Sequence, residues 1–346
     1  MSEDILLTVD YHDQNCVIRR RGVRSGQEQV QTVPTSDGDL LGVVRQARTA
    51  AGRGGRVIWV QESTTGWARV QALLGTRVEF VLANVLQMPL PPKGRRRKTD
   101  RIDTARMQRE YLNGELPRAH QPAAGWRQMR RVVACRENLV SRRTALRNWI
   151  NRYLAHETWA DRGGVWSAKG RRRLAAVVAG LPSRDALVVS AKLAELDELG
   201  PRLAAVEAEF AAIYDECPDA RQLDAVRGIG VIGAVSIVAR IGPVDRFRTA
   251  EQLIGYAGLA PGVRQSDQTR RSGRIGGGGT DRHLRHYLIE ATIWARQLPR
   301  YRPAYERVAK RRGPKVGRLV VARLLLRSIY KVLKDGVAFA PAAAGG

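Results

Sequence analysis

Two short apolar runs that each end in an acidic residue constrain the N-terminal part of this 346-residue chain most strongly. The first run leads into Asp10, and the second ends at Glu62. Short runs rich in Val and Ile predict buried strands, so both carboxylates would stand at strand ends. Asp100 and Asp103 follow at an i, i+3 spacing, which places both side chains on one face of a helix.

Four carboxylates gathered in one cleft would repel each other unless cations neutralise them. Two Mg²⁺ ions about 3.5–4 Å apart would do so, with Mn²⁺ able to substitute, and would stabilise both oxygens of an in-line phosphoryl displacement. We therefore expect Asp10, Glu62, Asp100 and Asp103 to be catalytic metal ligands acting on a phosphodiester. His12, close to Asp10, is either a proton carrier or a solvated side chain on an edge strand, and the second interpretation is favoured.

The balance of charge indicates a polyanionic partner. Lys and Arg number 59 against 33 Asp and Glu, a formal net charge of +26, which is typical of a nucleic-acid-binding protein. Three scattered cysteines, Cys16, Cys135 and Cys217, form no CxxC pair and so predict neither a zinc site nor a disulfide framework. Without an apolar stretch of membrane-spanning length, a cytoplasmic, nucleoid-associated protein is expected.

The excess of positive charge is concentrated in two blocks. Residues 1–92 are nearly neutral, with ten basic and nine acidic side chains, whereas 93–126 hold nine and four, and 127–173 hold thirteen and three. Residues 174–263 reverse the sign with eight basic against twelve acidic, and 264–331 return to eighteen against four. This alternation predicts two nucleic-acid-binding surfaces around an element that contacts protein.

The N-terminal region has the pattern of an α/β domain. Three predicted strands followed by alternating helix and strand form the order of an RNase H-like domain, which we expect over residues 1–125. A basic connector then precedes the helix of Asp100, and its Arg95, Arg96, Arg97 and Lys98 are predicted contacts to DNA or RNA. The predicted strands are 5–9, 16–18, 29–33, 57–60 and 78–82, with helices at 39–50 and 66–74.

Residues 126–218 are predicted to form helices that serve oligomerisation and RNA binding. Apolar side chains along 196–213 recur at alternating spacings of three and four, as in the seam of a coiled coil. A dimeric coiled coil and an amphipathic helix packed within its own chain fit this pattern equally well. Gly200-Pro201 predicts a break or kink. The residues of the seam are Leu196, Leu199, Leu203, Val206, Phe210 and Ile213.

The C-terminal region, 219–338, is expected to be a mainly α-helical domain, followed by a disordered tail at 339–346. Gly228 and Gly230 lie in a Gly-x-Gly turn that is typical of a helix-hairpin-helix, in which backbone N–H groups contact a DNA phosphate. The alternative is a glycine turn that merely joins two core helices.

A serine in an arginine-rich stretch is the candidate nucleophile. Guanidinium groups around Ser266 would stabilise both its alkoxide and the charge that develops on phosphorus, although most serines in basic loops only contact phosphate or solvent. The basic side chains predicted to bind nucleic acid here are Arg270, Arg271, Arg274 and Arg285.

Taken in order, these segments resemble the bridge-RNA-guided recombinases of a bacterial insertion-sequence family, transposases with an acidic DEDD RNase H-like domain and a C-terminal catalytic serine. The resemblance spans about nine-tenths of the chain. It rests on Val9-Asp10, Glu62 to Gly66, Lys98 to Arg106, Gly228-Ile229-Gly230, Ala257 to Pro261, Ser266 and Leu284-Arg285.

This resemblance implies a DNA recombinase whose four carboxylates hold the metal ions and whose Ser266 forms a covalent phosphoserine link. It places the serine eight residues after Gly258, which favours Ser266 over Ser272. It further implies double-stranded donor and target DNA, a structured noncoding guide RNA, and a homo-oligomer from dimer to tetramer. One alternative is a Holliday-junction resolvase-like endonuclease that uses water as the nucleophile. A second alternative is a nucleic-acid-binding protein without catalysis, which the intact acidic quartet disfavours because unused carboxylates would repel DNA.

Overall fold

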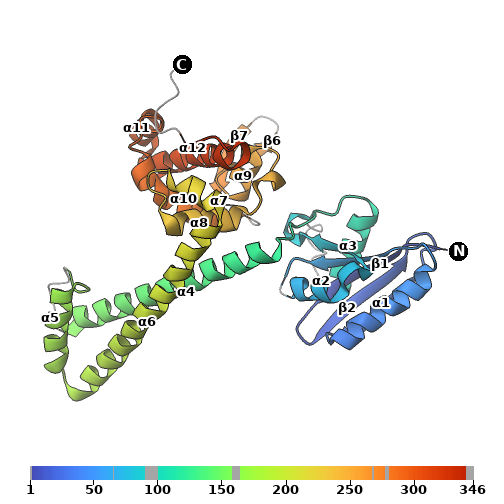
Figure 1. Cartoon of the computed structure of the whole chain (residues 1–346), viewed down its shortest axis with the longest axis horizontal. Helices are drawn as coiled ribbons and strands as arrows, with labels where there is room; N and C mark the ends of the chain where they lie inside the picture. Colours follow the sequence, from blue (N-terminus) through green and yellow to red (C-terminus); the bar gives the residue numbers. More distant parts are fainter. Residues whose placement is uncertain are drawn as a thin grey trace. The chain divides into compact units, whose positions relative to one another are not determined.

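The chain divides into two compact units, Met1–Gln121 and Pro122–Gly346 (Figure 1). The finer division expected from the sequence, with boundaries after residues 125, 218 and 338, stays a prediction. The predicted nucleic-acid contacts at 95–98 lie outside the described residues. The computed structural model describes residues 2–64, 66–89, 100–157, 164–266, 269–276 and 280–339, and only the backbone of 261–275.

The first unit is built on a mixed five-stranded sheet of order β3-β2-β1-β4-β5. The first three strands are antiparallel neighbours, whereas β1, β4 and β5 run parallel. All five predicted strands and both predicted helices are confirmed, because turn residues separate β-branched runs from amphipathic segments as expected. The elements are β1 (Ile5–Tyr11), β2 (Asn15–Gly22), β3 (Glu28–Pro34), α1 (Asp37–Ala51), β4 (Val57–Glu62), α2 (Trp67–Leu74), η1 (Gly75–Arg77), β5 (Glu79–Ala83), η2 (Val85–Gln87) and α3 (Asp100–Leu112).

Helices cover both faces of this sheet, and strand alternation decides which residues face which helix. Leu7 and Trp59 belong to the buried cluster formed with α1 and α2. Leu6 and Ile58, one residue earlier on their strands, pack instead with Met107 of α3. Since successive side chains of a strand point to opposite faces, the even-numbered positions near the ends of β1 and β4 lie on the α3 face.

The second unit begins with a helical hairpin. Helices α4 (Ala124–Glu157) and α6 (Ser183–Glu216) run antiparallel, since Arg136 pairs with Glu207 whereas Arg142 pairs with Glu195. Helix α5 (Ala168–Ala179) packs at the far end of the hairpin, where apolar side chains from all three helices form one buried cluster.

The predicted coiled-coil seam is buried by the chain itself. Phe210 is fully buried in a cluster that includes Val133 of α4, and Leu199 and Leu203 are also buried. Packing within the chain therefore accounts for the apolar periodicity. The expected break near Pro201 is wrong, because α6 is one continuous helix over the described residues 183–216, whereas the alternative of a kink stays a prediction. Buried residues on both sides of the proline hold the two halves of the helix on the same partner, which offsets the lost backbone hydrogen bond.

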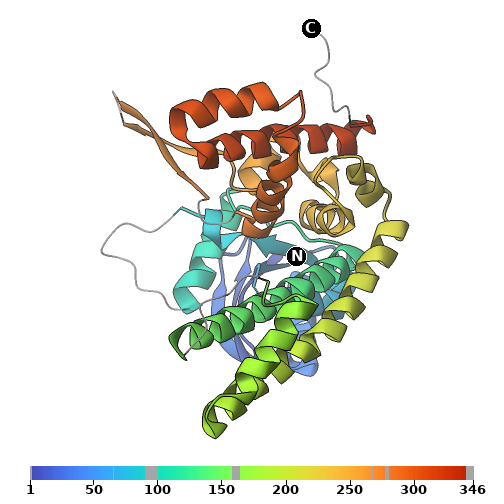
Figure 2. The ribbon, with the colours of Figure 1, turned by 90° about the vertical axis from the view of Figure 1, so that its left-hand side faces the viewer.

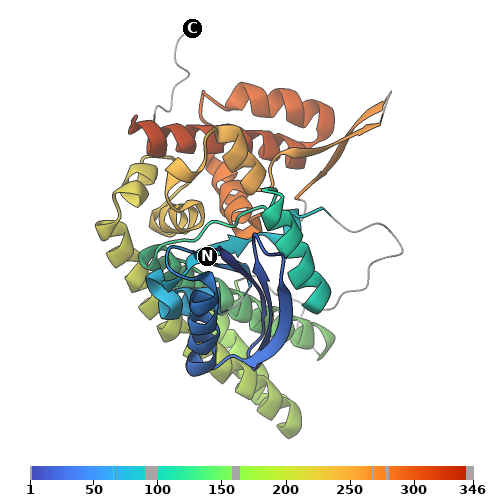
Figure 3. The ribbon, with the colours of Figure 1, turned by 90° about the vertical axis from the view of Figure 1, so that its right-hand side faces the viewer.

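The remaining helices form a body with one buried core. Six consecutive residues of α8, Ala234 to Ala239, are buried because α4, α6, α7 and α10 pack around this helix. Figures 2 and 3 show the hairpin of β6 and β7 standing out from these helices. The elements are α7 (Pro218–Asp224), α8 (Val231–Ile241), η3 (Val244–Arg246), α9 (Ala250–Tyr256), β6 (Pro261–Ser266), β7 (Thr269–Ile275), α10 (Arg282–Ala295), α11 (Arg302–Arg312) and α12 (Pro314–Asp335).

The mixed α/β N-terminal region and the mainly helical C-terminal region agree with the fold class expected from the sequence. Among the helices of the described residues, none combines the length and apolar character that crossing a bilayer requires.

Candidate functional site

Asp10, His12 and Asp100 come together at one end of the sheet. One ligand atom from each lies within 4.8 Å of the others. The Nε2 atom of His12 is 3.5 Å from Asp10 Oδ1 and 3.7 Å from Asp100 Oδ2. The Asp10 side chain is nearly buried, whereas the other two are more than half exposed, so the group opens to solvent. Two carboxylates and an imidazole are a donor set that fits a divalent cation.

The fold explains why these residues meet. Asp10 is the sixth residue of β1 and lies on the same face as Leu6, which is the face that α3 covers. Helix α3 begins at Asp100 and packs against β1 and β2, so its first turn lies above the end of β1. His12 follows directly after β1 in the turn that leads to β2.

Two further acidic residues of the predicted quartet lie close by in the fold. The parallel register pairs Val9 with Gln61, so Glu62 is the next residue beside Asp10, on the same face of the sheet. Asp103 stands one helical turn after Asp100 and is partly buried. Neither belongs to the group whose ligand atoms lie within 4.8 Å of one another. Convergence of all four carboxylates on metal ions therefore stays a prediction.

An open cavity of about 570 Å³ adjoins this group. His12 and Asp100 line it together with Asn15 and Thr32. Cys16 also lies here, but burial, followed by the negative charge of Asp10, raises the pKa of its thiol to about 11. Its Sγ donates to the carbonyl oxygen of Val33 at 3.6 Å. The thiol is therefore neutral near pH 7.

Ser266 is the last residue of β6 and lies at the turn end of the β6–β7 hairpin. The register pairs Ser266 with Thr269, whereas Ser272 pairs with Val263, farther from the turn. The predicted contacts Arg270, Arg271 and Arg274 all belong to β7. The described part of this hairpin is its backbone, so the roles of these four predicted side chains stay predictions.

Arg285 of α10 holds the base of this hairpin. Its Nη1 donates a hydrogen bond to the carbonyl oxygen of Gly258 at 3.3 Å. Gly258 and Gly276 both have a positive φ, 65° and 85°, and a Cβ atom at either position would collide with this guanidinium. The positive φ favours glycine at both positions, and the absence of a Cβ atom lets the guanidinium approach the backbone closely. The predicted contact of Arg285 with DNA is untested, and the side chain already has this partner within the protein.

The Gly-x-Gly turn joins α7 to α8 as the sequence predicted. Gly228 has a φ of 97°, and a Cβ atom there would lie 2.9 Å from both the Ala291 carbonyl oxygen and Trp294 Cβ. This contact with α10 gives Gly228 a packing role. Gly230 is the N-cap of α8, and nothing lies within 4 Å of its hypothetical Cβ. The open N-terminus of α8 leaves room for the predicted phosphate contact, which is untested.

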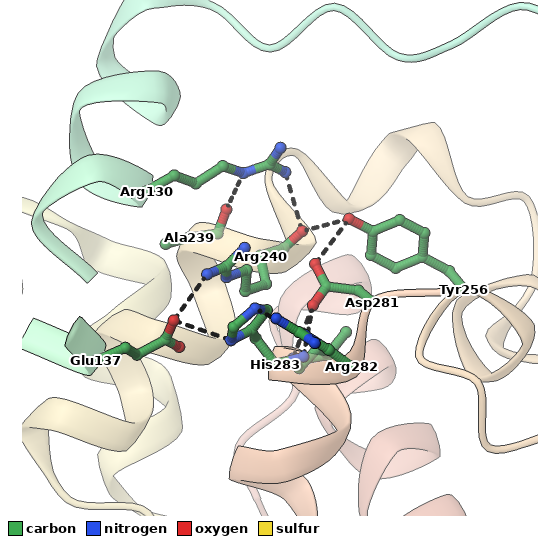
Figure 4. A network of polar contacts seen from close by, with 9 residues as sticks. Arg130, Glu137, Ala239, Arg240, Tyr256, Asp281, Arg282 and His283 are labelled. Atoms are coloured by element: carbon green, nitrogen blue, oxygen red, sulfur yellow. Dashed lines mark hydrogen bonds and ion pairs between the residues drawn. The ribbon is translucent and has the colours of Figure 1, made fainter. Parts of the chain in front are cut away.

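A polar network that the sequence did not predict joins four helices (Figure 4). Arg130 of α4 donates to the carbonyl oxygens of Ala239 and Arg240, at 2.7 and 3.0 Å, at the C-terminus of α8. Burial lowers the pKa of this arginine. Glu137 Oε2 lies 3.2 Å from Arg240 Nη2 and 2.9 Å from His283 Nδ1. The hydrogen bonds of Arg130 supply partners for two of the last carbonyl groups of α8, which the helix itself leaves unpaired.

The network continues to the first turn of α10. Asp281 is the N-cap of this helix and accepts hydrogen bonds from the backbone N–H groups of His283 and Leu284, at 3.0 and 2.9 Å. The Tyr256 hydroxyl donates to the same carboxylate at 3.2 Å. Aspartate is a common N-cap residue, and Arg240 and the Tyr256 hydroxyl connect this one to the residues of α4. The network thereby fixes the helix from which Arg285 reaches the hairpin.

Comparison of the sequence with known proteins finds similarity to transposases. Residues 220–307, which span the glycine turn and the β6–β7 hairpin, match the family described as transposase IS116/IS110/IS902. The chain is 27% identical over 237 residues to y4qE of Sinorhizobium fredii, which is named as a transposase; the match covers 68% of this chain and 57% of that one.

Two further relatives match shorter segments. The transposase for insertion sequence element IS1111A of Coxiella burnetii is 28% identical over 38% of this chain and 36% of its own. A protein of Pseudomonas aeruginosa that is named as a family 20 transposase is 32% identical to this chain; the match covers 44% of this chain and 46% of that one. The matches thus span between about a third and three-fifths of these relatives' lengths. Through the domain at 220–307, the chain is similar to transposases of the IS116/IS110/IS902 family.

Proposed function

We propose that this protein is a transposase of a bacterial insertion sequence, a DNA recombinase that cuts and rejoins strands through a covalent bond to Ser266. The match of residues 220–307 to the transposase family carries the proposal. The order β3-β2-β1-β4-β5 supports an RNase H-like first unit, and the group of Asp10, His12 and Asp100 supports a metal site in it.

In the proposed reaction the Ser266 hydroxyl attacks a DNA phosphorus atom. A serine–phosphate bond forms, the bond from phosphorus to one sugar oxygen breaks, and a strand with a free hydroxyl leaves. A hydroxyl of another strand then attacks the same phosphorus, releases the serine and restores a phosphodiester, so no ATP is consumed.

The predicted quartet Asp10, Glu62, Asp100 and Asp103 would hold divalent cations, with Mg²⁺ expected and Mn²⁺ able to replace it. Such ions neutralise charge on the transferring phosphoryl group. Through such ions the carboxylates would fix the position of the scissile phosphate, and the arginines of β7 would stabilise charge as it develops on the phosphoryl oxygens. Ser266 and the quartet belong to different units, so a homo-oligomer, from dimer to tetramer, would let different copies contribute them.

The distribution of charge supports nucleic-acid binding by both basic blocks. A net charge of +26 attracts phosphate, and arginine can pair with it through two parallel hydrogen bonds. We propose that double-stranded donor and target DNA bind here together with a structured noncoding RNA, whose base pairing selects the sites. In that case the protein reads chiefly the shape and backbone of the RNA.

Trapping the covalent intermediate tests this proposal. Protein, guide RNA and end-labelled DNA are incubated with Mg²⁺, denatured, and separated on a denaturing gel. We expect a protein–DNA adduct with the unaltered protein and with Ser272→Ala, and none with Ser266→Ala. Cleavage without an adduct, accompanied by uptake of ¹⁸O from labelled water, would favour the resolvase-like hydrolase. Binding without cleavage would favour a non-catalytic protein.

A further inference from the structure

We infer that His12 is a direct ligand of the divalent cation beside Asp10 and Asp100, and that its imidazole makes the site prefer Mn²⁺ over Mg²⁺. This inference rests on the metal site of the proposed function and assigns a nitrogen donor that the acidic quartet lacks. It replaces the interpretation favoured from the sequence, in which the His12 side chain is only solvated.

The distances within the group fit ligands that share an ion better than they fit hydrogen bonds. An imidazole bound to a carboxylate would have its nitrogen about 2.7–3.2 Å from the oxygen. The Nε2 atom of His12 is 3.5 and 3.7 Å from its two nearest carboxylate oxygens. Neighbouring ligands that each lie about 2.1 Å from one cation are roughly 3.0–3.5 Å apart. The two His12 distances are at the upper end of this range or a few tenths of an ångström above it, and the ligand atoms of Asp10 and Asp100 lie within 4.8 Å of each other.

The backbone around His12 is held in place, so the imidazole does not depend on a loose loop for its position. The N–H of His12 donates to the carbonyl oxygen of Asn15 at 3.2 Å across the turn between β1 and β2. Thr35 fixes the middle of this turn through two hydrogen bonds. Its hydroxyl donates to the carbonyl oxygen of Asp13 at 2.6 Å, and its N–H donates to the carbonyl oxygen of Gln14 at 3.0 Å.

The surroundings leave room for an ion with its water. His12 and Asp100 both line the open cavity of about 570 Å³, and their side chains are 58% and 52% exposed. Solvent can therefore complete the coordination sphere on the open side. The nearly buried Asp10 carboxylate closes the other side.

The nitrogen donor has a consequence for the choice of metal. Mg²⁺ favours oxygen ligands and keeps much of its water, whereas imidazole suits first-row transition ions. Mn²⁺ accepts both kinds of ligand, so His12 should strengthen Mn²⁺ binding with little effect on Mg²⁺. Loss of even an outer partner of a metal ligand weakens metal binding by about 10–100-fold, so loss of a direct ligand should cost at least about tenfold.

Magnetic resonance on the full-length protein loaded with Mn²⁺ tests the assignment without any activity measurement. Electron spin echo envelope modulation detects the ¹⁴N nucleus of an imidazole bound directly to Mn²⁺. We expect this signal in the unaltered protein and its loss in His12→Ala, with Mn²⁺ binding at least about tenfold weaker. His156→Ala is the matched control, because this exposed histidine belongs to α4 in the other unit and should change neither reading.

The His12→Asp variant keeps a metal-binding side chain at position 12 but replaces its nitrogen donor by oxygen. It should retain metal binding but lose the ¹⁴N signal and narrow the preference for Mn²⁺ over Mg²⁺. Mn²⁺ bound without a ¹⁴N signal, equal affinity in His12→Ala, or no Mn²⁺ bound at millimolar concentration would overturn the inference. If these metal results fail but the Ser266–DNA adduct still forms, the inference about His12 is overturned and the proposed function stands. If Mn²⁺ binds through His12 but no adduct forms, only the metal site is supported.

Discussion

Arg285 on α10 donates a hydrogen bond to the carbonyl oxygen of Gly258 at 3.3 Å and packs against Gly276, so one guanidinium contacts the chain before and after the β6–β7 hairpin. The hairpin carries Ser266 at its turn end. A side chain that fixes both ends of a projecting hairpin determines the direction in which its tip points. In the proposed function, this contact positions the nucleophile.

Gly276→Ala tests this positioning role. Gly276 has a φ of 85°, a conformation that alanine rarely adopts, and its added methyl group would displace the Arg285 guanidinium from the base of the hairpin. We expect adduct formation to fall by up to about a hundredfold, since misplacement of a reacting group by about 1 Å has that effect. Thermal unfolding should change little. Gly255→Ala on α9 is the matched control, because nothing lies within 4 Å of its hypothetical Cβ; equal adduct yields from the two variants would argue against the role.

The base of the hairpin also shows what sequence alone could not supply. Glycines at 258 and 276 were visible, but their shared contact with Arg285 depends on how α10 packs. The strands were predictable, because their β-branched runs are bounded by turns. The place of His12 beside the two carboxylates was not predictable, since an exposed histidine in a turn belongs to no periodic pattern. Asp100 comes close to it only because the start of α3 lies above β1.

Periodicity likewise identified the apolar seam of α6 without identifying its partner. A row of apolar side chains has the same spacing whether it packs against another copy or against a helix of its own chain. The structure assigns Phe210 to the chain's own core. The break predicted near Pro201 was wrong for a related reason. Local propensity predicts a break there, but burial of residues on both sides of the proline overrides this propensity.

Phe210→Asp should unfold the helical hairpin rather than separate subunits. Phe210 is fully buried, and loss of a buried phenylalanine side chain costs about 3–5 kcal/mol before the cost of burying a charge is added. Circular dichroism during heating measures the loss, and light scattering measures the mass. Glu209→Ala, at the exposed neighbouring position, should leave unfolding unchanged. A Phe210→Asp protein that stays fully helical but becomes monomeric would instead support the intermolecular seam.

Glu137→Ala should destabilise the second unit. The change removes the carboxylate that pairs with Arg240 and His283, whose side chains are only 16% and 36% exposed. Leaving such partly buried groups without their partner costs about 1–3 kcal/mol, which denaturant unfolding can measure. Glu306→Ala breaks an ion pair between two exposed side chains of α11 and should have little effect. Similar losses from both variants would contradict a structural role for the network in Figure 4.

Replacing Arg270, Arg271 and Arg274 together by Gln should weaken DNA binding most at low salt. Each contact to a phosphate of duplex DNA contributes about 0.9 to the slope of log K against log salt concentration, so the slope should fall by up to about three. Fluorescence anisotropy over a series of salt concentrations measures it. Arg202→Gln on α6, where the arginine pairs with Glu198, is the control and should keep the slope. An unchanged slope in the triple variant would exclude phosphate contacts by these arginines.

Mass spectrometry can identify the residue that carries the DNA strand in the proposed intermediate. Trypsin cuts after Arg264, Arg270, Arg271 and Arg274, so Ser266 falls in the peptide Gln265–Arg270 and Ser272 in Ser272–Arg274. After nuclease digestion of the trapped complex, we expect a nucleotide phosphate on the first peptide, with fragment ions that localise it to Ser266. A nucleotide on Ser272–Arg274, or strand cleavage in a sample in which neither peptide is modified, would contradict this expectation.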